Sequence, residues 1–298
     1  LLKPIICIKM IFKKTIPIAA GIIATGFISS CDFNEDFCIR PGELIAYCDF
    51  SNIKEEPPLP YLRHVIPFQG NLSVNEGTTF TQDTLRWKIP QGDYQFFFYT
   101  GDYKLENKED YYECKLTALT DTIEGLAYIA EKQKYCCSAM FNEKLEYQNP
   151  KKVKVLPWSF VQKVNIHLQL EGNTSPISSI TAELSGVSTS RYLYSREASG
   201  SAIVKEPFAK SDNNWQNCSN SIYVFGFSQA DANILKVNVI MNEENQAFNE
   251  VQEIDLSSEL KSFTSDEITL YLTLHVGKDL TLNKVTIDEW EDTPETEL

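Results

Sequence analysis

Alternation of apolar and polar residues is the feature that most constrains the fold of this chain. Residues 164–170 carry an aliphatic side chain at every second position, and residues 268–276 repeat the pattern. A period of two places the aliphatic side chains on one face of a β-strand and the polar ones on the other. His167 and His275 fall on the polar positions, so we expect both to face solvent. Both segments predict half-buried antiparallel strands.

Turn-forming residues separate the other strand candidates. Pro90-Gln91-Gly92-Asp93 and Glu171-Gly172-Asn173 are typical of turns between strands. Helix signals are few: residues 121–124 fit a capping box before an apolar run, and residues 255–261 fit one or two helical turns. Many short strands and few helices predict β-sandwiches. The further strand candidates are residues 43–49, 63–68, 84–89, 94–100, 111–117, 152–156, 179–184, 221–227, 235–241 and 250–256.

A change in composition near Asn149-Pro150 predicts a domain boundary. The polar, cysteine-containing stretch before it gives way to a segment of lysines and aliphatic residues at 151–157. Residues 43–150 and 151–298 each have the usual size of one sandwich domain. The sequence therefore predicts an all-β fold with an N-terminal and a C-terminal antiparallel β-sandwich domain.

The first thirty residues predict a secretory signal peptide. Lys13 and Lys14 precede a mostly apolar run that is too short to span a bilayer comfortably and ends in small residues before Cys31. We expect Met10 to be the true start and residues 1–9 to be an over-extended leader. The alternatives are an ordinary signal peptide without lipid attachment and an N-terminal membrane anchor.

The end of this run resembles the lipobox of bacterial lipoproteins. Its residues are Ile28, Ser29 and Ser30, followed by Cys31. The resemblance implies cleavage between Ser30 and Cys31, a diacylglyceryl thioether on the Cys31 sulfur, and an acyl chain such as palmitate on its amine. Two or three acyl chains hold a protein on a membrane far more durably than one. Residues 31–42 would then form a lipidated tether.

Acidic residues dominate both the tether and the whole chain. Asp32, Glu35 and Asp36 follow the predicted lipid cysteine, and the chain has a formal net charge of −14. Similar acidic clusters act as a surface-export signal in lipoproteins of Gram-negative gut anaerobes; the alternative is a solvated tether. The negative charge argues against nucleic acid as a partner. We expect a protein lipid-anchored in the cell outer membrane and exposed on its outside.

Cysteines and motifs give no indication of a metal site, a cofactor or catalysis. No CxxC pair, Gly-x-Ser-x-Gly, HExxH, Walker A or GxGxxG motif occurs. We therefore expect no enzymatic activity. Six further cysteines permit disulfides in an exported protein, but the sequence does not choose among their pairings. They are Cys38, Cys48, Cys114, Cys136, Cys137 and Cys218.

Three stretches carry a family resemblance. Residues 87–96 contain a P-x-G-x-Y turn before an aromatic strand, residues 164–187 hold two alternating segments, and residues 285–292 end in a W-x-D tail. Together they resemble the fimbrillin-like lipoproteins of Gram-negative anaerobes, the family of type V pilus shaft, tip and anchor subunits. The resemblance implies two tandem transthyretin-like sandwiches. It also implies assembly with other fimbrial subunits by β-strand complementation, in which a segment of one subunit fills a groove in another.

Arginine positions favour one role within that family. Shaft precursors lose an N-terminal strand after an arginine, and only Arg40 and Arg63 lie early enough in the mature chain. The bond after Arg40 is a poor one for that cut because Pro41 follows it. We therefore predict an anchor or accessory subunit that keeps its lipid and supports cell adhesion.

A surface glycan-binding lipoprotein of a polysaccharide-uptake system is the alternative function. Trp158 beside Pro157 and Trp215 among asparagines look exposed enough to stack on host or bacterial glycans. Trp215 is the candidate ligand contact, whereas Trp87 and Trp290 are expected to fill sandwich cores or edges.

Overall fold

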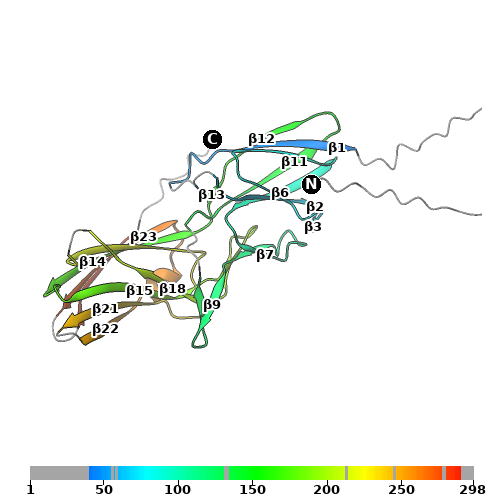
Figure 1. Ribbon diagram of the computed structural model, residues 1–298. Coiled ribbons are helices and arrows are strands. Elements are labelled where there is room, and N and C mark those ends of the chain that lie inside the picture. Colours follow the sequence, from blue (N-terminus) through cyan, green and yellow to red (C-terminus); the bar gives the residue numbers. More distant parts are fainter. Residues whose placement is uncertain are drawn as a thin grey trace, which may run out of the picture. The chain divides into compact units, whose positions relative to one another are not determined.

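The alternating segments of the second half of the chain pair into two facing sheets (Figure 1). The computed structural model describes residues 40–54, 57, 60–130, 134–211, 214–243, 246–276 and 280–289. One sheet contains, in spatial order, β19 (Ala209–Lys210), β20 (Asn217–Val224), β14 (Gln162–Gly172), β23 (Glu267–Val276) and β24 (Leu280–Glu289). The other contains β22 (Gln246–Asp255), β21 (Ile234–Glu243), β15 (Ile177–Val187), β18 (Ala202–Pro207), β10 (Leu126–Ile129) and β9 (Thr120–Ile123).

The core of this sandwich consists of the aliphatic residues that the alternation singled out. Ile166 of β14 and Leu270 of β23 come from one sheet, and Leu184 of β15 and Val237 of β21 come from the other, all fully buried. Their polar neighbours in sequence point outward, and His167 and His275 are exposed as predicted. The positions that the alternation predicts to be buried are therefore the positions that face the core.

The first half of the chain also forms two facing sheets. One is β12 (Lys151–Val155), β1 (Pro41–Cys48) and β5 (Thr84–Pro90); the other is β13 (Trp158–Ser159), β11 (Cys137–Leu145), β6 (Gly92–Thr100), β2 (Arg63–Gln69) and β3 (Leu72–Ser73), with β4 (Thr78–Phe80) also paired to β2. Leu44, Leu85 and Phe98 fill the core between them. The prediction of an all-β sandwich fold is confirmed.

Strand β6 is buried on both of its faces. Phe96 and Phe98 point into the core beneath β1, and Phe97 points into a second core on the opposite side. That second core is covered by a small sheet, β17 (Ala198–Ser199), β16 (Ser190–Tyr192), β8 (Lys115–Thr117) and β7 (Lys104–Glu106). Phe160 and Phe225 complete it. The strand predicted at residues 111–117 is thus only the short β8.

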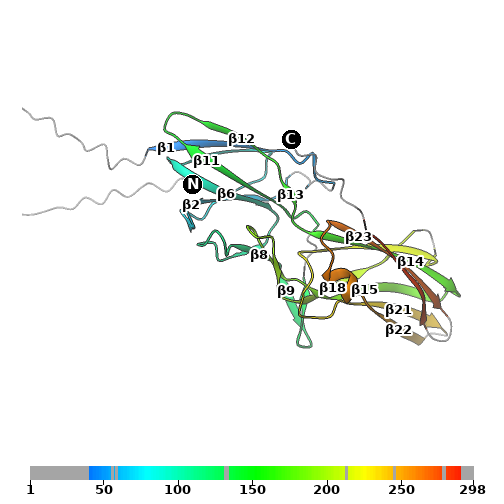
Figure 2. The same ribbon diagram turned by 180° about the vertical axis from the view of Figure 1, so that it is seen from behind.

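The capping box expected at residues 121–124 is wrong. These residues form β9 and the turn of a hairpin, in which Leu126 pairs with Ile123 and both Glu124 and Gly125 have positive φ. Two consecutive positive φ values are characteristic of a tight hairpin turn, which the Glu-Gly pair allows. Figure 2 shows the hairpin beside β18. The short helix expected at residues 255–261 is present as α1 (Ser257–Lys261).

Parallel pairing is the main departure from the predicted antiparallel order. β14 and β23 lie side by side in parallel, although each has an antiparallel neighbour on its other edge. β1 is parallel to β12 and antiparallel to β5.

The chain from Arg40 onward groups as one unit, so the domain boundary at Asn149-Pro150 stays a prediction. In the described part of the chain, no helix has the length and apolar character needed to cross a membrane.

Candidate functional site

Strand β1 occupies an internal slot of the first sandwich. Its residues pair with β12 from Leu44 to Cys48 and with β5 from Pro41 to Tyr47, so both of its edges are hydrogen-bonded. Leu44 and Ala46 are completely buried, whereas Tyr47 on the other face is half exposed. Removal of this strand would leave an apolar groove between β12 and β5, which is the geometry that a complementing strand requires.

The two early arginines differ completely in accessibility. Arg63 lies in β2 with no solvent exposure. Its Nη1 donates to the Thr81 carbonyl at 3.0 Å, its Nη2 to Asp83 Oδ1 at 3.2 Å, and its guanidinium carbon lies 5.2 Å from the centre of the Phe50 ring. Arg40 is exposed and directly precedes Pro41. A protease that cuts after arginine can therefore reach Arg40 in the folded protein but not Arg63.

Two strands of the second sandwich lie at the ends of their sheets. β24 pairs only with β23, and β22 pairs only with β21. Each thus has one edge of main-chain donors and acceptors that no strand covers within the described part of the chain. Such edges are sites at which a further strand can add.

A cleft of about 410 Å³ opens beside Trp158. We call it the Trp158 cleft. Its walls combine apolar and aromatic side chains with lysines and carboxylates, and they come from five separate parts of the chain. The lining residues are Asn52, Ile53, Lys54, Lys134, Cys137, Leu156, Pro157, Trp158, Ser159, Val161, Lys163, Tyr223, Asp266 and Glu267.

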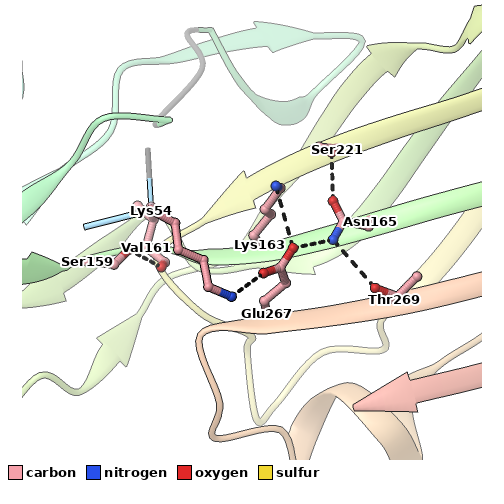
Figure 3. Close-up of polar contacts among 8 residues, drawn as sticks. All are labelled: Lys54, Ser159, Val161, Lys163, Asn165, Ser221, Glu267 and Thr269. Carbon is pink, nitrogen blue, oxygen red and sulfur yellow. Dashed lines mark hydrogen bonds and ion pairs between the residues drawn. The ribbon is translucent and has the colours of Figure 1, made fainter. Parts of the chain in front are cut away.

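Glu267 organises the polar wall of this cleft (Figure 3). Its carboxylate accepts hydrogen bonds from Lys54 Nζ at 3.0 Å and from Asn165 Nδ2 at 2.6 Å, and Lys163 Nζ lies at 3.5 Å. Asn165 Oδ1 in turn accepts from Ser221 Oγ at 2.8 Å. Burial opposes ionisation of Glu267, but these bonds and the two lysines outweigh it and lower its pKa. The contact with Lys54 joins the two halves of the chain.

Trp158 is half buried at the cleft. The guanidinium carbon of Arg196 lies 4.2 Å from the centre of the indole ring, which is cation–π distance. The indole Nε1 has no hydrogen-bond partner among the described residues. Trp158 is thus less exposed than the sequence suggested, and its ring lines a cavity rather than an open surface.

The expected exposure of Trp215 is wrong. Its side chain is only 7% exposed and belongs to the core of the second sandwich, with Lys210 Nζ 4.5 Å from the ring centre. The asparagines around it in sequence suggested a surface position, but its ring turns inward between the sheets. Trp87 packs half buried against the first core, as expected. Trp290 lies outside the described residues, so its predicted place stays a prediction.

The described cysteines are buried thiols. Cys48, Cys114, Cys136, Cys137 and Cys218 are all unpaired with one another. Burial raises the pKa of Cys48 and of Cys137 to about 12, so these thiols stay protonated and unreactive at neutral pH. Cys38, the lipid-attachment residue Cys31 and the lipobox residues Ile28, Ser29 and Ser30 lie outside the described residues. No group of three His, Cys, Asp or Glu side chains in the described ranges is placed to hold a metal ion.

Sequence comparison identifies no relative. No protein-family model matches the chain, and no curated protein matches it significantly.

Solved structures, in contrast, match over most of the chain. A candidate adhesin from Bacteroides ovatus is 14% identical, covers 86% of this chain and 100% of its own length, and has a TM-score of 0.53. The fimbrial anchor protein Mfa2 from Porphyromonas gingivalis is 12% identical, covers 84% and 98%, and has a TM-score of 0.51. This chain has the fold of that adhesin and of that fimbrial anchor. The all-β sandwich fold expected from the fimbrillin-like resemblance is confirmed.

Proposed function

We propose that this protein is a non-catalytic, cell-surface subunit of a fimbrium that acts as an anchor or accessory component and supports adhesion. The observation that carries the proposal is the pairing of β1 on both edges. A subunit that fills its own slot does not need a partner strand there. It can still offer a sheet edge to a neighbour, and therefore suits one end of an assembly.

The accessibility of the arginines supports retention of β1. A cut after Arg63 would release β1, but this side chain is fully buried and bonded to Thr81 and Asp83. A cut after Arg40 would remove only the tether and leave β1 in place. Neither position therefore offers a route from the folded protein to an open slot. This favours an anchor over a shaft subunit.

The position of the tether gives the same strand a mechanical role. If Cys31 carries lipid, a pull on the assembly is transmitted to β1 through Pro41, the first residue of that strand. Because β1 is hydrogen-bonded on both edges along its length, a force applied along the strand would be shared by many hydrogen bonds at once. An anchor needs this kind of attachment.

A disulfide lock between β1 and β5 tests whether β1 must leave. Ile45 and Arg86 are direct cross-strand neighbours, so Ile45→Cys with Arg86→Cys places two thiols at bonding range. We expect the oxidised variant to join fimbriae as efficiently as the reduced one, with incorporation measured by immunoblot of purified fimbriae. Ile45→Cys alone is the control. Loss of incorporation only in the oxidised double variant would contradict the proposal.

Lipid attachment is tested separately at Cys31. We expect Cys31→Ser to abolish incorporation of labelled palmitate and to shift the protein from the outer-membrane fraction to the soluble fraction. Cys38→Ser, seven residues further along, is the matched control and should change neither. Unaltered membrane association of the Cys31 variant would refute the lipid anchor but not the role of β1.

The alternative, a glycan-binding surface lipoprotein, loses its named contact residue. With 7% exposure, the Trp215 ring offers no stacking face. A solved structure from Bacteroides thetaiotaomicron with a TM-score of 0.53 and 8% identity is described as a candidate polysaccharide-binding protein. Saturable binding to a polysaccharide panel would restore this alternative.

A further inference from the structure

The sheet of β12, β1 and β5 has one face in the first core and one face toward solvent. Leu44, Ala46 and Cys48 of β1 are buried on the inner face, so Ile45 and Tyr47 lie on the outer one. Figure 1 shows β12 and β1 along the outer side of the first sandwich. Tyr47 is half exposed, so the described part of the chain leaves this surface open. We call it the β1 outer face.

Strand pairing gathers basic side chains on the β1 outer face. Ile45 has Arg86 of β5 opposite it on one side and Lys152 of β12 on the other. Directly paired residues point to the same face of a sheet, and so do residues two positions apart in one strand. All the basic side chains that share this face are exposed. They are Arg86 and Lys88 of β5 and Lys152 and Lys154 of β12.

Two of the four basic groups have carboxylate partners. Lys154 Nζ lies 2.6 Å from Asp49 Oδ2, and Arg86 Nη1 lies 3.9 Å from Glu43 Oε1. These two carboxylates are the acidic groups that the pairing places at the β1 outer face. Four basic and two acidic side chains give this face an excess of positive charge, although the chain has a formal net charge of −14.

Lys88 and Lys152 supply the excess charge. Neither forms an ion pair or a hydrogen bond with any residue that the structure describes, although Lys88 lies opposite Glu43 in β1. Charged side chains on the edge strands of a sheet also prevent unwanted pairing, but either sign of charge serves that purpose. A chain with 41 acidic and 27 basic residues nevertheless places lysines here. This choice favours a partner with negative charge.

The tether joins the central strand of this same sheet. Nine residues separate Cys31 from Pro41, the first residue of β1. Fully extended, they reach about 30 Å, so a lipid on Cys31 would keep the start of this sheet within that distance of the membrane. Anionic headgroups attract lysine and arginine side chains, and the attraction falls off within a Debye length. Acidic groups elsewhere on the chain therefore do not cancel it.

We propose that the β1 outer face docks on anionic lipid headgroups of the membrane that holds the tether. Lys88 and Lys152 form ion pairs with headgroup phosphates, and Tyr47 enters the interfacial region, where tyrosine is favoured. Because the lipid keeps this face near the membrane, a weak interaction suffices to orient the first sandwich. The orientation rests on the lipid attachment of the proposed function, whereas the affinity of the face for anionic lipid does not.

Vesicle binding of the chain without its lipid tests this affinity. The protein runs from Asp32 to Leu298, which removes the predicted signal peptide and Cys31 and keeps every described strand. It is sedimented with vesicles of phosphatidylcholine alone, or with about one-third phosphatidylglycerol. We expect the partition coefficient to be at least about tenfold higher on the anionic vesicles. Raising the salt from about 0.05 to about 0.5 M should remove most of this difference, because it screens the charges.

Lysine substitutions locate the contact. Lys88→Gln with Lys152→Gln should lower the partition coefficient on anionic vesicles at least about fivefold. The matched control is Lys205→Gln with Lys236→Gln, which removes two ion-paired lysines of the second sandwich and changes the net charge equally. We expect the control to bind like the unmodified chain. Thermal melts of all variants establish that they are folded.

A fluorescent label reports which face meets the lipid. Tyr47→Cys and Tyr271→Cys each place one thiol at a similarly exposed position, in the first and the second sandwich respectively. The described native thiols are buried, and Cys38→Ser in both variants removes the cysteine that lies outside the described residues. We expect a headgroup nitroxide in anionic vesicles to quench the label at position 47 and not the label at position 271.

Three results would overturn the proposal. These are equal or absent binding to the two kinds of vesicle, equal effects of the two lysine pairs, and equal quenching of the two labels. Each would leave the lipid anchor untouched, because the protein in these assays carries no lipid. Conversely, failure of palmitate labelling at Cys31 would remove the anchor but not the affinity of the β1 outer face for anionic vesicles.

Discussion

Substitution of Leu44 by alanine should lower the free energy that holds β1 in the first sandwich. Leu44 is completely buried at the centre of the strand, between β12 and β5, and contributes to the first core. Loss of a buried leucine side chain typically costs 2–5 kcal/mol, and we expect about 3 kcal/mol at this tightly packed position. Ile45→Ala is the matched control, because Ile45 is its neighbour on the opposite, half-buried face of the strand and should cost about 1 kcal/mol.

Limited proteolysis can report this loosening at Arg63. Cleavage there requires the buried side chain to become accessible through local opening of the structure. When this opening is fast compared with cleavage, the cleavage rate is proportional to the population of the open form. A loss of about 3 kcal/mol corresponds to an increase of about 150-fold in that population. The assay measures, by mass spectrometry, the product of a trypsin-like protease that begins at His64. Cleavage after Lys54, whose side chain is 68% exposed, provides the internal reference.

Two results would refute this reasoning. If Ile45→Ala accelerated the cut after Arg63 as much as Leu44→Ala does, the buried face of β1 would not be what protects Arg63. If the unmodified protein were cut after Arg63 as fast as after Lys54, the arginine would be accessible in the native state. The second result would also remove the support that the burial of Arg63 gives to the proposed anchor role.

The remaining predictions concern Glu267 and Trp215. Glu267 has a lowered pKa, so its bonds stabilise the folded state above the pKa of an unfolded glutamate and lose their effect as the pH falls through the lower folded value. The difference in melting temperature between the native protein and Glu267→Gln should therefore be largest at neutral pH and shrink in acid; a difference independent of pH would contradict this. Trp215→Ala should lower the free energy of unfolding by about 3–5 kcal/mol in chemical denaturation, because the ring fills the second core. Trp158→Ala should cost less, since that side chain is only half buried, and equal costs would contradict the assigned burial.

The sequence was sufficient to predict strands, but not which strands are neighbours. Alternation at residues 164–170 and 268–276 depends only on which face of each strand is buried, and it is the same for parallel and antiparallel partners. β14 and β23 were therefore recognised individually, while their parallel pairing was not. The hairpin at Ile123–Leu126 was missed because a capping box and a turn use similar residues, and the φ values of Glu124 and Gly125 decide between them.

The cleft could not be predicted because its lining comes from distant segments. Lys54, Trp158 and Glu267 become neighbours only when both halves of the chain are folded, and no local spacing links them. For Trp215 a local pattern was available but misleading, because polar neighbours in sequence do not determine the direction in which its ring points. The burial of Arg63 did have a local signal, namely the apolar residues that follow it in β2.

The pairing of β10 with β18 has a consequence for how the protein is made. β10 belongs to the part of the chain that is synthesised first, yet its neighbour β18 and the core against which Ala127 packs come from the second half. Until β18 has been synthesised, the edge of β10 that pairs with it and the side chain of Ala127 lack these native partners. Folding of the first half therefore cannot finish before β18 has been synthesised, and a nascent chain arrested at this stage would expose an unpaired strand edge to other proteins.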